Sequence, residues 1–431
     1  MLTLDDGKIN FHRARCCQCG VCLPSCPTDA LSSEPNQAGF FDIVCHHEAC
    51  IVCNLCVKVC PPNWLPNDRA TEEQVRTAPG LYLAHARDER IRWMSSSGGV
   101  ARTITSEVLA QGRVDAVYSL LYPESQDSTE NAADHNGPRP LPERVLPTGE
   151  EVKGTWLTVA PPTERIPCSM YRPVLWGSAL GQGHKDWQRV LLVGLPCQLK
   201  GAERLLKKLL PRTKLFKVAI FCRKQKVLGH TDCIKRMMSR PDEATAQVYY
   251  RGAGWPGKSG VYAGGQPLDV DYFYNARCWT LPACHSCPDC LGAGSADLTL
   301  TDPWGIVRKQ DDPAGSNLVF AWTPAGKELL AQLDSVIACK PCGADDAVRS
   351  VDFDHQVADK IRAMPYHLAS ETSAAGWMRG FVDALATWLA ETQLRFMHPR
   401  STPVRMQIAI MRGLRVGVGK ITGWLSGKSK R

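Results

Sequence analysis

From about residue 80 onward, hydrophobic positions along the chain alternate between helical and strand spacing. Apolar side chains recur at a helical period over residues 101–111 and 199–210, whereas 114–121, 190–193 and 215–221 are apolar runs of strand length. Strands that alternate with helices in this order indicate an α/β domain. We therefore expect an α/β fold over the middle of the chain.

Two stretches depart from this alternation. Residues 122–150 are polar and contain proline, asparagine and aspartate, which predicts an insertion loop on the surface. Residues 374–396 are helical in period, with aromatic and leucine side chains on one side, and prolines follow. We expect a helix and then a basic tail over residues 373–431.

The distribution of cysteine changes this picture most. Ten of the 20 cysteines lie before residue 61, and Cys-x2-Cys-x2-Cys-x3-Cys-Pro occurs twice among them. Three thiolates at this spacing on a tight loop can bind one face of a cubane cluster, while the fourth reaches the other cluster. One 4Fe–4S cluster is expected to take Cys16, Cys19, Cys22 and Cys60, and the second to take Cys50, Cys53, Cys56 and Cys26.

This repeat predicts a bacterial-type two-cluster ferredoxin domain over residues 1–66. Two zinc knuckles are the alternative, but zinc sites rarely show eight cysteines that interlock in this way. Cys17 and Cys45 fall outside the repeat and are interpreted as spare thiols.

Cysteine usage and charge distribution indicate which cellular compartment and which classes of partner to expect. Many cysteines, with no apolar export signal after Met1 and no run of 18 apolar residues, favour metal ligation in a reducing compartment, so we expect a cytoplasmic protein. Eight Lys or Arg and no acid follow residue 398, and the rest of the chain is neutral, which argues against a nucleic-acid-binding surface. The tail could contact anionic lipid, dock an acidic partner or be a disordered solubilising segment.

Several segments of the α/β region carry candidate chemistry. Ser95–Val100 precedes a predicted helix, where hydroxyls and glycine N–H groups can hold a phosphate or a flavin edge, although such a cluster can also be a plain loop. Gly194–Gln198 closes one strand and Cys222 closes the next, where α/β sheets gather ligands. Cys284–Cys290 is a Cys-x2-Cys-x2-Cys run with metal-like spacing, and a zinc site is an alternative there.

Taken in order, these motifs resemble a known family. The motifs are Ser-Ser-Gly-Gly, Gly-x-Pro-Cys-Gln, Arg251 with Gly254-Trp255, Cys-x2-Cys and Asp-x-Thr-x-x-Asp-x-Trp-Gly, over roughly residues 10–310. They are similar to the beta-subunit family of deazaflavin-coenzyme-reducing hydrogenases and dehydrogenases, in particular to bacterial members with a fused two-cluster ferredoxin domain. The resemblance implies an FAD-binding α/β domain over residues 80–372 and a third 4Fe–4S cluster close to the flavin.

Carried over residue by residue, the resemblance implies a set of site residues. The third cluster would take Cys197, Cys222, Cys284 and Cys287, with Cys290 as the alternative to any one of them. The flavin would lie among Ser96, Ser97, Gly98, Gly99, Tyr171, Gly194, Pro196, Gln198, Arg251 and Trp255. The family's Ser-Lys-Tyr and Cys-His-Gly become Ser169-Met170-Tyr171 and Cys222-Arg223-Lys224 here, which removes a Lys and a His and leaves the substrate open.

The combined pattern, of the α+β and α/β class, favours an iron–sulfur flavoprotein oxidoreductase. Electrons would pass between an external one-electron partner (a ferredoxin, or a hydrogenase or dehydrogenase subunit), three clusters and FAD, with hydride transfer to or from an organic acceptor. The acceptor could be a deazaflavin coenzyme, a tetrapyrrole, a sugar-linked intermediate or another unsaturated metabolite. The alternatives are an electron-transfer subunit whose partner carries the catalysis, and a zinc-bound structural or nucleic-acid module. No Gly-x-Gly-x-x-Gly follows a strand, so no nicotinamide site is expected.

Overall fold

The computed structural model of the chain describes most residues up to 351. The described ranges are 1–36, 39–63, 71–122, 154–167, 169–228, 231, 247–249, 251, 254–257, 260–263, 266–269, 280–285, 287 and 289–351. Nearly all of the expected insertion loop, the expected helix at 374–396 and the basic tail lie outside the described residues. No helix in the described part of the chain is long and apolar enough to cross a membrane.

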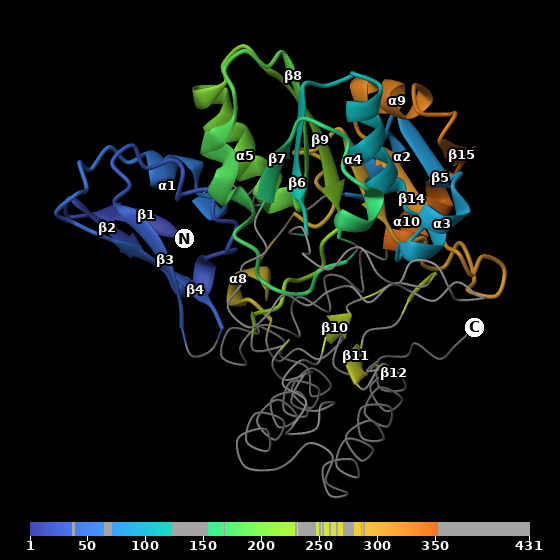
Figure 1. The fold of residues 1–431 in the computed structure, drawn as a ribbon, viewed down its shortest axis with the longest axis horizontal. Coiled ribbons are helices and arrows are strands. Elements are labelled where there is room, and N and C mark those ends of the chain that lie inside the picture. Colours follow the sequence, from blue (N-terminus) through green and yellow to red (C-terminus); the bar gives the residue numbers. More distant parts are fainter. Residues whose placement is uncertain are drawn as a thin grey trace, which may run out of the picture.

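The N-terminal region consists of two antiparallel hairpins and the two cysteine loops (Figure 1). The strands place alternate side chains inward, so that Leu2, Ile9, Leu31 and Ile43 form a small core in contact with ligand thiols. Its elements are β1 (Leu2–Asp5), β2 (Lys8–Phe11), η1 (Arg13–Arg15), β3 (Leu31–Pro35), β4 (Phe41–Cys45), α1 (Leu55–Val59) and η2 (Pro61–Asn63).

The rest of the described chain is built on one eight-stranded mixed sheet with the order β15-β5-β14-β13-β9-β8-β6-β7. Its four central strands β13, β9, β8 and β6 run parallel, and antiparallel strands extend the sheet on both sides. The strands are β5 (Gly80–Ala86), β6 (Ala116–Leu120), β7 (Gly154–Leu157), β8 (Arg189–Gly194), β9 (Lys214–Ile220), β13 (Leu298–Thr301), β14 (Asn317–Ala321) and β15 (Ile337–Pro341).

Helices cover both faces of this sheet, because its central strands are apolar on both sides. On β8, Val190 and Leu192 face α5, whereas Leu191 and Val193 face the core that α4 and α9 complete. The remaining helices and a small separate sheet flank these layers (Figure 1). The further elements are α2 (Glu72–Arg76), α3 (Glu89–Met94), α4 (Val100–Ala110), η3 (Thr163–Arg165), η4 (Trp176–Gln182), α5 (Pro196–Leu209), β10 (Gln247–Tyr249), β11 (Gly260–Ala263), β12 (Gln266–Asp269), α8 (Pro282–His285), α9 (Pro324–Ala331) and α10 (Ala344–Val351).

The expected alternation is confirmed in the parallel half of the sheet. The helices expected at 101–111 and 199–210 are α4 and α5, and the three expected strands are β6, β8 and β9. Strand β13 and its antiparallel neighbours β14, β5 and β15 were not predicted from the pattern. Several of these strands pair with partners distant in sequence, such as β14 with β5, so no local repeat indicates them.

The N-terminal region packs against α5 through a core that both regions share. Cys19, Val21 and Val59 are buried with Leu199 of α5 and with Trp176 of η4. The backbone N–H of Gly177 donates a 2.7 Å hydrogen bond to the carbonyl of Cys19. A Cβ at Gly177 would lie only 2.5 Å from Val21 Cγ2, so the two backbones approach as closely as a glycine permits. The first cysteine loop is thereby held at the start of α5.

Candidate functional site

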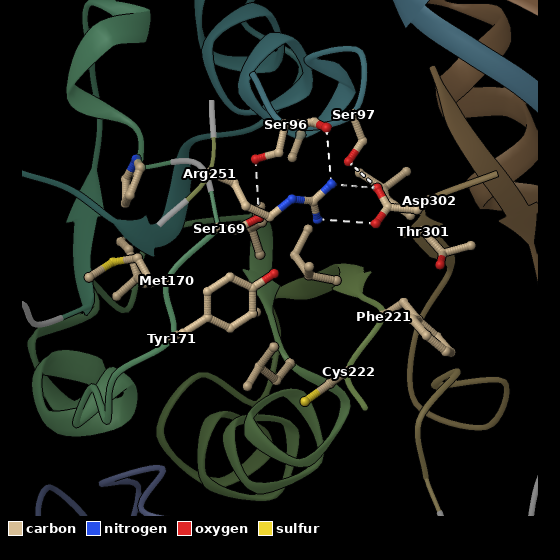
Figure 2. Close-up of a pocket in the computed structure, with 18 of the residues that line it drawn as sticks. Ser96, Ser97, Ser169, Met170, Tyr171, Phe221, Cys222, Arg251, Thr301 and Asp302 are labelled. Carbon is tan, nitrogen blue, oxygen red and sulfur yellow. Dashed lines mark hydrogen bonds and ion pairs between the residues drawn. The ribbon is translucent and has the colours of Figure 1, made fainter. Parts of the chain in front are cut away.

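The carboxyl ends of the four parallel strands open into one cavity of about 630 Å³. Leu120, Gly194, Cys222 and Thr301, at or just after the ends of β6, β8, β9 and β13, all line it. Parallel strands end at the same edge of a sheet, which is why open α/β sheets place their ligand sites there. Figure 2 shows the polar side chains that converge on this cavity from separate segments.

The Ser-Gly segment forms one wall of the cavity at the start of α4. Ser96, Ser97 and Gly99 line the cavity, and Gly98 supports the turn from behind. Gly98 and Gly99 have φ values of +83° and +78°. A Cβ at Gly98 would lie 2.8 Å from Cα of Ser316, so both the backbone conformation and the space require glycine there.

An ion pair between Arg251 and Asp302 organises this wall (Figure 2). Arg251 Nη1 and Nη2 each donate to a different Asp302 oxygen at 3.1 Å, and Nη2 also donates to the Ser96 carbonyl at 3.1 Å. Ser97 Oγ donates to Asp302 Oδ1 at 2.5 Å, and Trp255 Nε1 donates to the same oxygen at 3.3 Å. The Asp302 carboxylate therefore accepts hydrogen bonds from three of the residues predicted to surround a flavin, and Arg251 links a fourth, Ser96, to them.

Asp302 itself was not among the predicted site residues. It stands inside the Asp-x-Thr-x-x-Asp-x-Trp-Gly motif and directly follows β13, so its position at a strand end was the available signal. Its side chain and that of Arg251 are 14% and 11% exposed. Because this bidentate ion pair is largely shielded from water, it holds the Arg251 guanidinium in a fixed plane.

The opposite wall is formed around the start of α5. Gly194 and Gln198 line the cavity, whereas Pro196 occupies the first helical turn without lining it. Gln198 Oε1 accepts from the N–H of Leu195 at 2.7 Å, which satisfies an N–H that the helix itself cannot pair. Tyr171 also lines the cavity, near Cys222 in Figure 2.

The cavity carries an excess of positive charge. Among the described residues that line it, Asp302 is the one acid, and the bases are Arg102, Arg223, Lys224, Lys226 and Arg251. Lys226 is only 1% exposed, and its Nζ donates to Thr280 Oγ1 at 3.1 Å. The Lys and His that the family pattern would place here are absent, yet the cations that remain favour an anionic ligand. Sequence reasoning missed Lys226 and Arg102, because a single base in a loop or on a helix is usually solvated, and nothing local shows that these two are buried.

The two cysteine loops of the N-terminal region have the same backbone conformation at equivalent positions. Gln18 and Gly20 in the first loop have φ values of +54° and +75°, and Val52 and Asn54 in the second have +54° and +62°. Left-handed backbone is uncommon for residues other than glycine and is retained where the loop must curl tightly. The repeat in sequence is therefore also a repeat in structure.

Thiols of the two predicted sets lie close to one another in this region. Burial raises the pKa of Cys56 to about 11, and the nearby Cys26, Cys53 and Cys50 raise it further by charge repulsion. Burial also raises the pKa of Cys22 well above its ordinary value, and so does charge repulsion from Cys16 and Cys60 and from Cys56 of the other predicted set. Thiols forced together in this way are stabilised when iron binds their deprotonated forms.

The third predicted set is assembled from separate segments. Cys197 lies in the first turn of α5, and Cys222 and Cys287 are close enough to raise its pKa by charge repulsion, after the larger contributions of its contact with Cys17 and of burial. Cys284 lies in α8, where its Sγ accepts from the N–H of Gln225 at 3.3 Å. Cys222, Cys284 and Cys290 line the cavity, so these thiols and the Ser-Gly wall share one space.

No group of three or more His, Cys, Asp or Glu among the described residues converges as tightly as the ligands of one metal ion. Thiolates around a cubane stand farther apart than those around a zinc ion, because four irons and four sulfides separate them.

Comparisons with known proteins give two family matches and likenesses to solved structures. Residues 187–363 match the family described as the C terminus of the coenzyme F420 hydrogenase/dehydrogenase beta subunit, and residues 15–64 match the family described as 4Fe-4S dicluster domain. None of the curated proteins matches the chain. A chain of the F420-reducing [NiFe] hydrogenase complex from Methanosarcina barkeri is similar at 16% identity and a TM-score of 0.48, over 66% of this chain and 90% of that chain.

Proposed function

Because the chain belongs to the coenzyme F420 hydrogenase/dehydrogenase beta-subunit family and carries a 4Fe–4S dicluster domain, we propose that it is an FAD-dependent iron–sulfur oxidoreductase. It passes electrons between an external one-electron partner protein and an organic acceptor. The acceptor is a deazaflavin coenzyme or another unsaturated metabolite, bound in the cavity at the strand ends.

One observation carries this proposal: a single cavity is bounded on one side by the Ser-Gly wall and on another by thiols. Ser97 and Arg251 line it together with Cys222 and Cys284. A phosphate-binding type of turn and metal-binding side chains that share one space support a flavin held next to a cluster.

The residues that would hold each group follow from this arrangement. Bound clusters would exchange single electrons, and a bound flavin would exchange one or two. Cys197, Cys222, Cys284 and Cys287 would ligate the cavity-side cluster, with Cys290 as the alternative to one of them. Ser96 and Ser97 would present hydroxyl oxygens and Gly99 a backbone N–H to the flavin, and Gly98 would allow the turn that exposes them.

The chain's own side chains would set the electrostatics of the site. Asp302 holds Arg251 and Ser97 in place before any ligand arrives, so neither side chain needs to reorganise, and Ser97 Oγ keeps its lone pairs as acceptors. Lys226 and Arg102 add buried positive charge, which favours the anionic phosphates of FAD and any ligand that gains negative charge on reduction.

The test is the cofactor content of the full-length chain purified without oxygen. We expect about twelve iron, about twelve acid-labile sulfide and about one FAD per chain, which three 4Fe–4S clusters and one flavin require. About eight iron with FAD would retain the flavoenzyme and remove the third cluster. Protein without flavin would overturn the proposal.

Turnover distinguishes the enzyme from a subunit of a larger complex. The isolated chain, supplied with a reduced viologen, is expected to reduce a small organic acceptor such as a deazaflavin. Full cofactor content without any such turnover, together with co-purification of a stoichiometric partner, would instead identify an electron-transfer subunit.

A further inference from the structure

Trp304 is an exposed aromatic side chain in the wall of the strand-end cavity. It lines the cavity, yet 44% of the residue is exposed to solvent. Tryptophan is highly buried on average, so this exposure calls for a ligand or another contact to cover the ring. Because Trp304 is both part of the lining and open to solvent, it lies at the opening of the cavity, which we call the cavity mouth.

The ring of Trp304 packs on a neighbour that is itself fixed. The Trp304 and Trp255 rings have centroids 4.9 Å apart and planes inclined at 47°. Trp255 is 3% exposed, and its Nε1 donates to Asp302 at 3.3 Å. A Cβ at Gly315 would lie only 2.5 Å from Trp255 Cβ, so the chain packs closely against Trp255 on that side as well. The Trp255 ring therefore supports the Trp304 ring with little freedom to move.

The backbone that carries Trp304 is also held by hydrogen bonds. The N–H of Ile306 donates to the carbonyl of Pro303 at 3.1 Å, which closes a turn around Trp304. Ser350 Oγ, in α10, donates to the carbonyl of Asp302 at 3.3 Å. A ring that is ordered before its ligand arrives loses little conformational entropy on binding, which favours affinity.

We propose that Trp304 is a specificity-determining residue, on which the planar ring of the organic acceptor stacks at the cavity mouth. The inference rests on the proposed function, because it takes the acceptor to bind in the same cavity as FAD. Stacking on an aromatic ring requires a flat conjugated partner. Among the acceptors that the sequence leaves open, Trp304 therefore favours those with a planar conjugated ring over a sugar-linked intermediate.

The position of Trp304 assigns it to the acceptor rather than to the flavin. Ser96, in the wall proposed for the flavin, is 5% exposed, whereas Trp304 is 44% exposed. A flavin stays bound through many turnovers, but an acceptor must enter and leave in each one. The exposed ring thus faces the ligand that exchanges with solvent. FAD also carries planar rings, so the experiment measures the two ligands separately.

Trp187 provides a matched control. Its ring forms a tilted pair with Trp156, with centroids 4.8 Å apart and planes inclined at 56°, so the two tryptophan pairs are alike in geometry. Trp187 packs against the core beside α5 and is not among the described residues that line the cavity. Trp187→Ala therefore removes the same side chain from a similar pair without changing the cavity.

The experiment compares full-length Trp304→Ala, Trp304→Phe and Trp187→Ala with the unsubstituted chain, each purified without oxygen. FAD affinity is measured by fluorescence titration of the flavin-free protein. The binding of 5-deazariboflavin to the FAD-loaded protein is measured by fluorescence anisotropy, and its KM and kcat are measured with reduced methyl viologen as donor. Trp304→Ala is expected to bind 5-deazariboflavin about tenfold more weakly, as the loss of one stacking ring implies. Its KM should rise by a similar factor, and kcat should change less.

The other measurements make the result specific. Trp304→Phe is expected to stay within about threefold of the unsubstituted chain, because a smaller aromatic ring still stacks. Trp187→Ala is expected to bind 5-deazariboflavin as the unsubstituted chain does. Equal 5-deazariboflavin affinity in Trp304→Ala would overturn the inference, and so would a loss of FAD affinity alone, since the ring would then serve the cofactor. An FAD-loaded unsubstituted chain that does not bind 5-deazariboflavin would overturn it as well. An unsubstituted chain without FAD would instead be a failure of the proposed function.

Discussion

The N-terminal region and the cavity of the α/β region build their sites in opposite ways. All eight predicted ferredoxin ligands lie between Cys16 and Cys60, in two segments whose cysteine loops have the same backbone conformation. The cavity instead draws its lining from segments between Ser95 and Asn317 that only the folded sheet brings together. A local site can be recognised from spacing, whereas a site at strand ends depends on the whole topology. The two sites should therefore respond independently to substitution, except where they meet at α5.

The largest expected effect is the loss of the third cluster alone, on substitution of one of its predicted ligands. Cys197→Ser should remove the cavity-side cluster, because Cys197 lies within reach of Cys222 and Cys287. Iron should fall from about twelve to about eight per chain, with both ferredoxin signals retained in EPR spectra. Cys53→Ser is the converse variant and should leave the third signal intact. If Cys197→Ser kept all of its iron, Cys197 would not be a ligand.

The next effect is specific to the flavin side of the cavity. Asp302→Asn removes the charge that holds Arg251 and Ser97, and such charged hydrogen bonds contribute about 1.5–3 kcal/mol. FAD affinity, measured by fluorescence titration of the flavin-free protein, should fall about 10- to 100-fold. Iron content should not change. Asp311→Asn, at an exposed pair with Arg308, makes the same charge change and should leave FAD affinity unaltered.

A smaller effect is expected where the two regions meet. Gly177→Ala would place a Cβ 2.5 Å from Val21, and overpacking of this kind costs about 1–3 kcal/mol. Thermal unfolding should start at a lower temperature, and flavin reduction through the ferredoxin domain should slow. Gly294→Ala is the control, since nothing lies within 4 Å of its Cβ position. Equal stability of the two variants would show that the contact at Val21 relaxes freely.

The smallest effect concerns pH and the first cysteine loop. The Arg13 guanidinium hydrogen-bonds Asp42 and lowers the pKa of that carboxyl below its ordinary value. A lowered pKa stabilises the fold above the unfolded value of about 3.9, and this stabilisation is lost as the pH falls through the lowered pKa. Asp42→Asn should lower the free energy of unfolding by about 0.2–1 kcal/mol near pH 6, and should have no effect at a pH below the lowered pKa of Asp42. Asp6→Asn, on the exposed β1–β2 turn, serves as the control in parallel urea melts.

The sequence predicted well what short stretches determine. The cysteine repeat predicted the 4Fe–4S dicluster domain, and the alternating periods predicted α4, α5, β6, β8 and β9, because each signal lies within a short stretch of the chain. The Ser-Gly segment and Gly194 were also placed correctly on one cavity. Gly98, Pro196 and Trp255 were predicted with them, and they support the wall from outside the cavity.

What the sequence did not reveal depends on contacts between distant segments. Asp302 gains its role from Arg251, which is 51 residues away, and Lys226 is buried only because Thr280 and the cavity wall cover it. Cys17 looked redundant in the repeat, since its contact with Cys197 exists only after the N-terminal region packs on α5. Burial and partner choice of this kind are tertiary properties, and single-residue patterns do not encode them.

The short helix α1 has a consequence for how the ferredoxin sites fail. Cys56 lies within α1 and Cys60 at its C-terminal end, yet the first is predicted to belong to one ligand set and the second to the other. Because both thiols belong to the same short helix, a displacement of α1 would distort both cluster sites together. Coupling between two binding sites is reciprocal, so a cluster bound at either site would stabilise cluster binding at the other by the same free energy. Oxidation of the exposed Cys53 would therefore also weaken iron binding at the other site, to which the buried Cys60 is assigned.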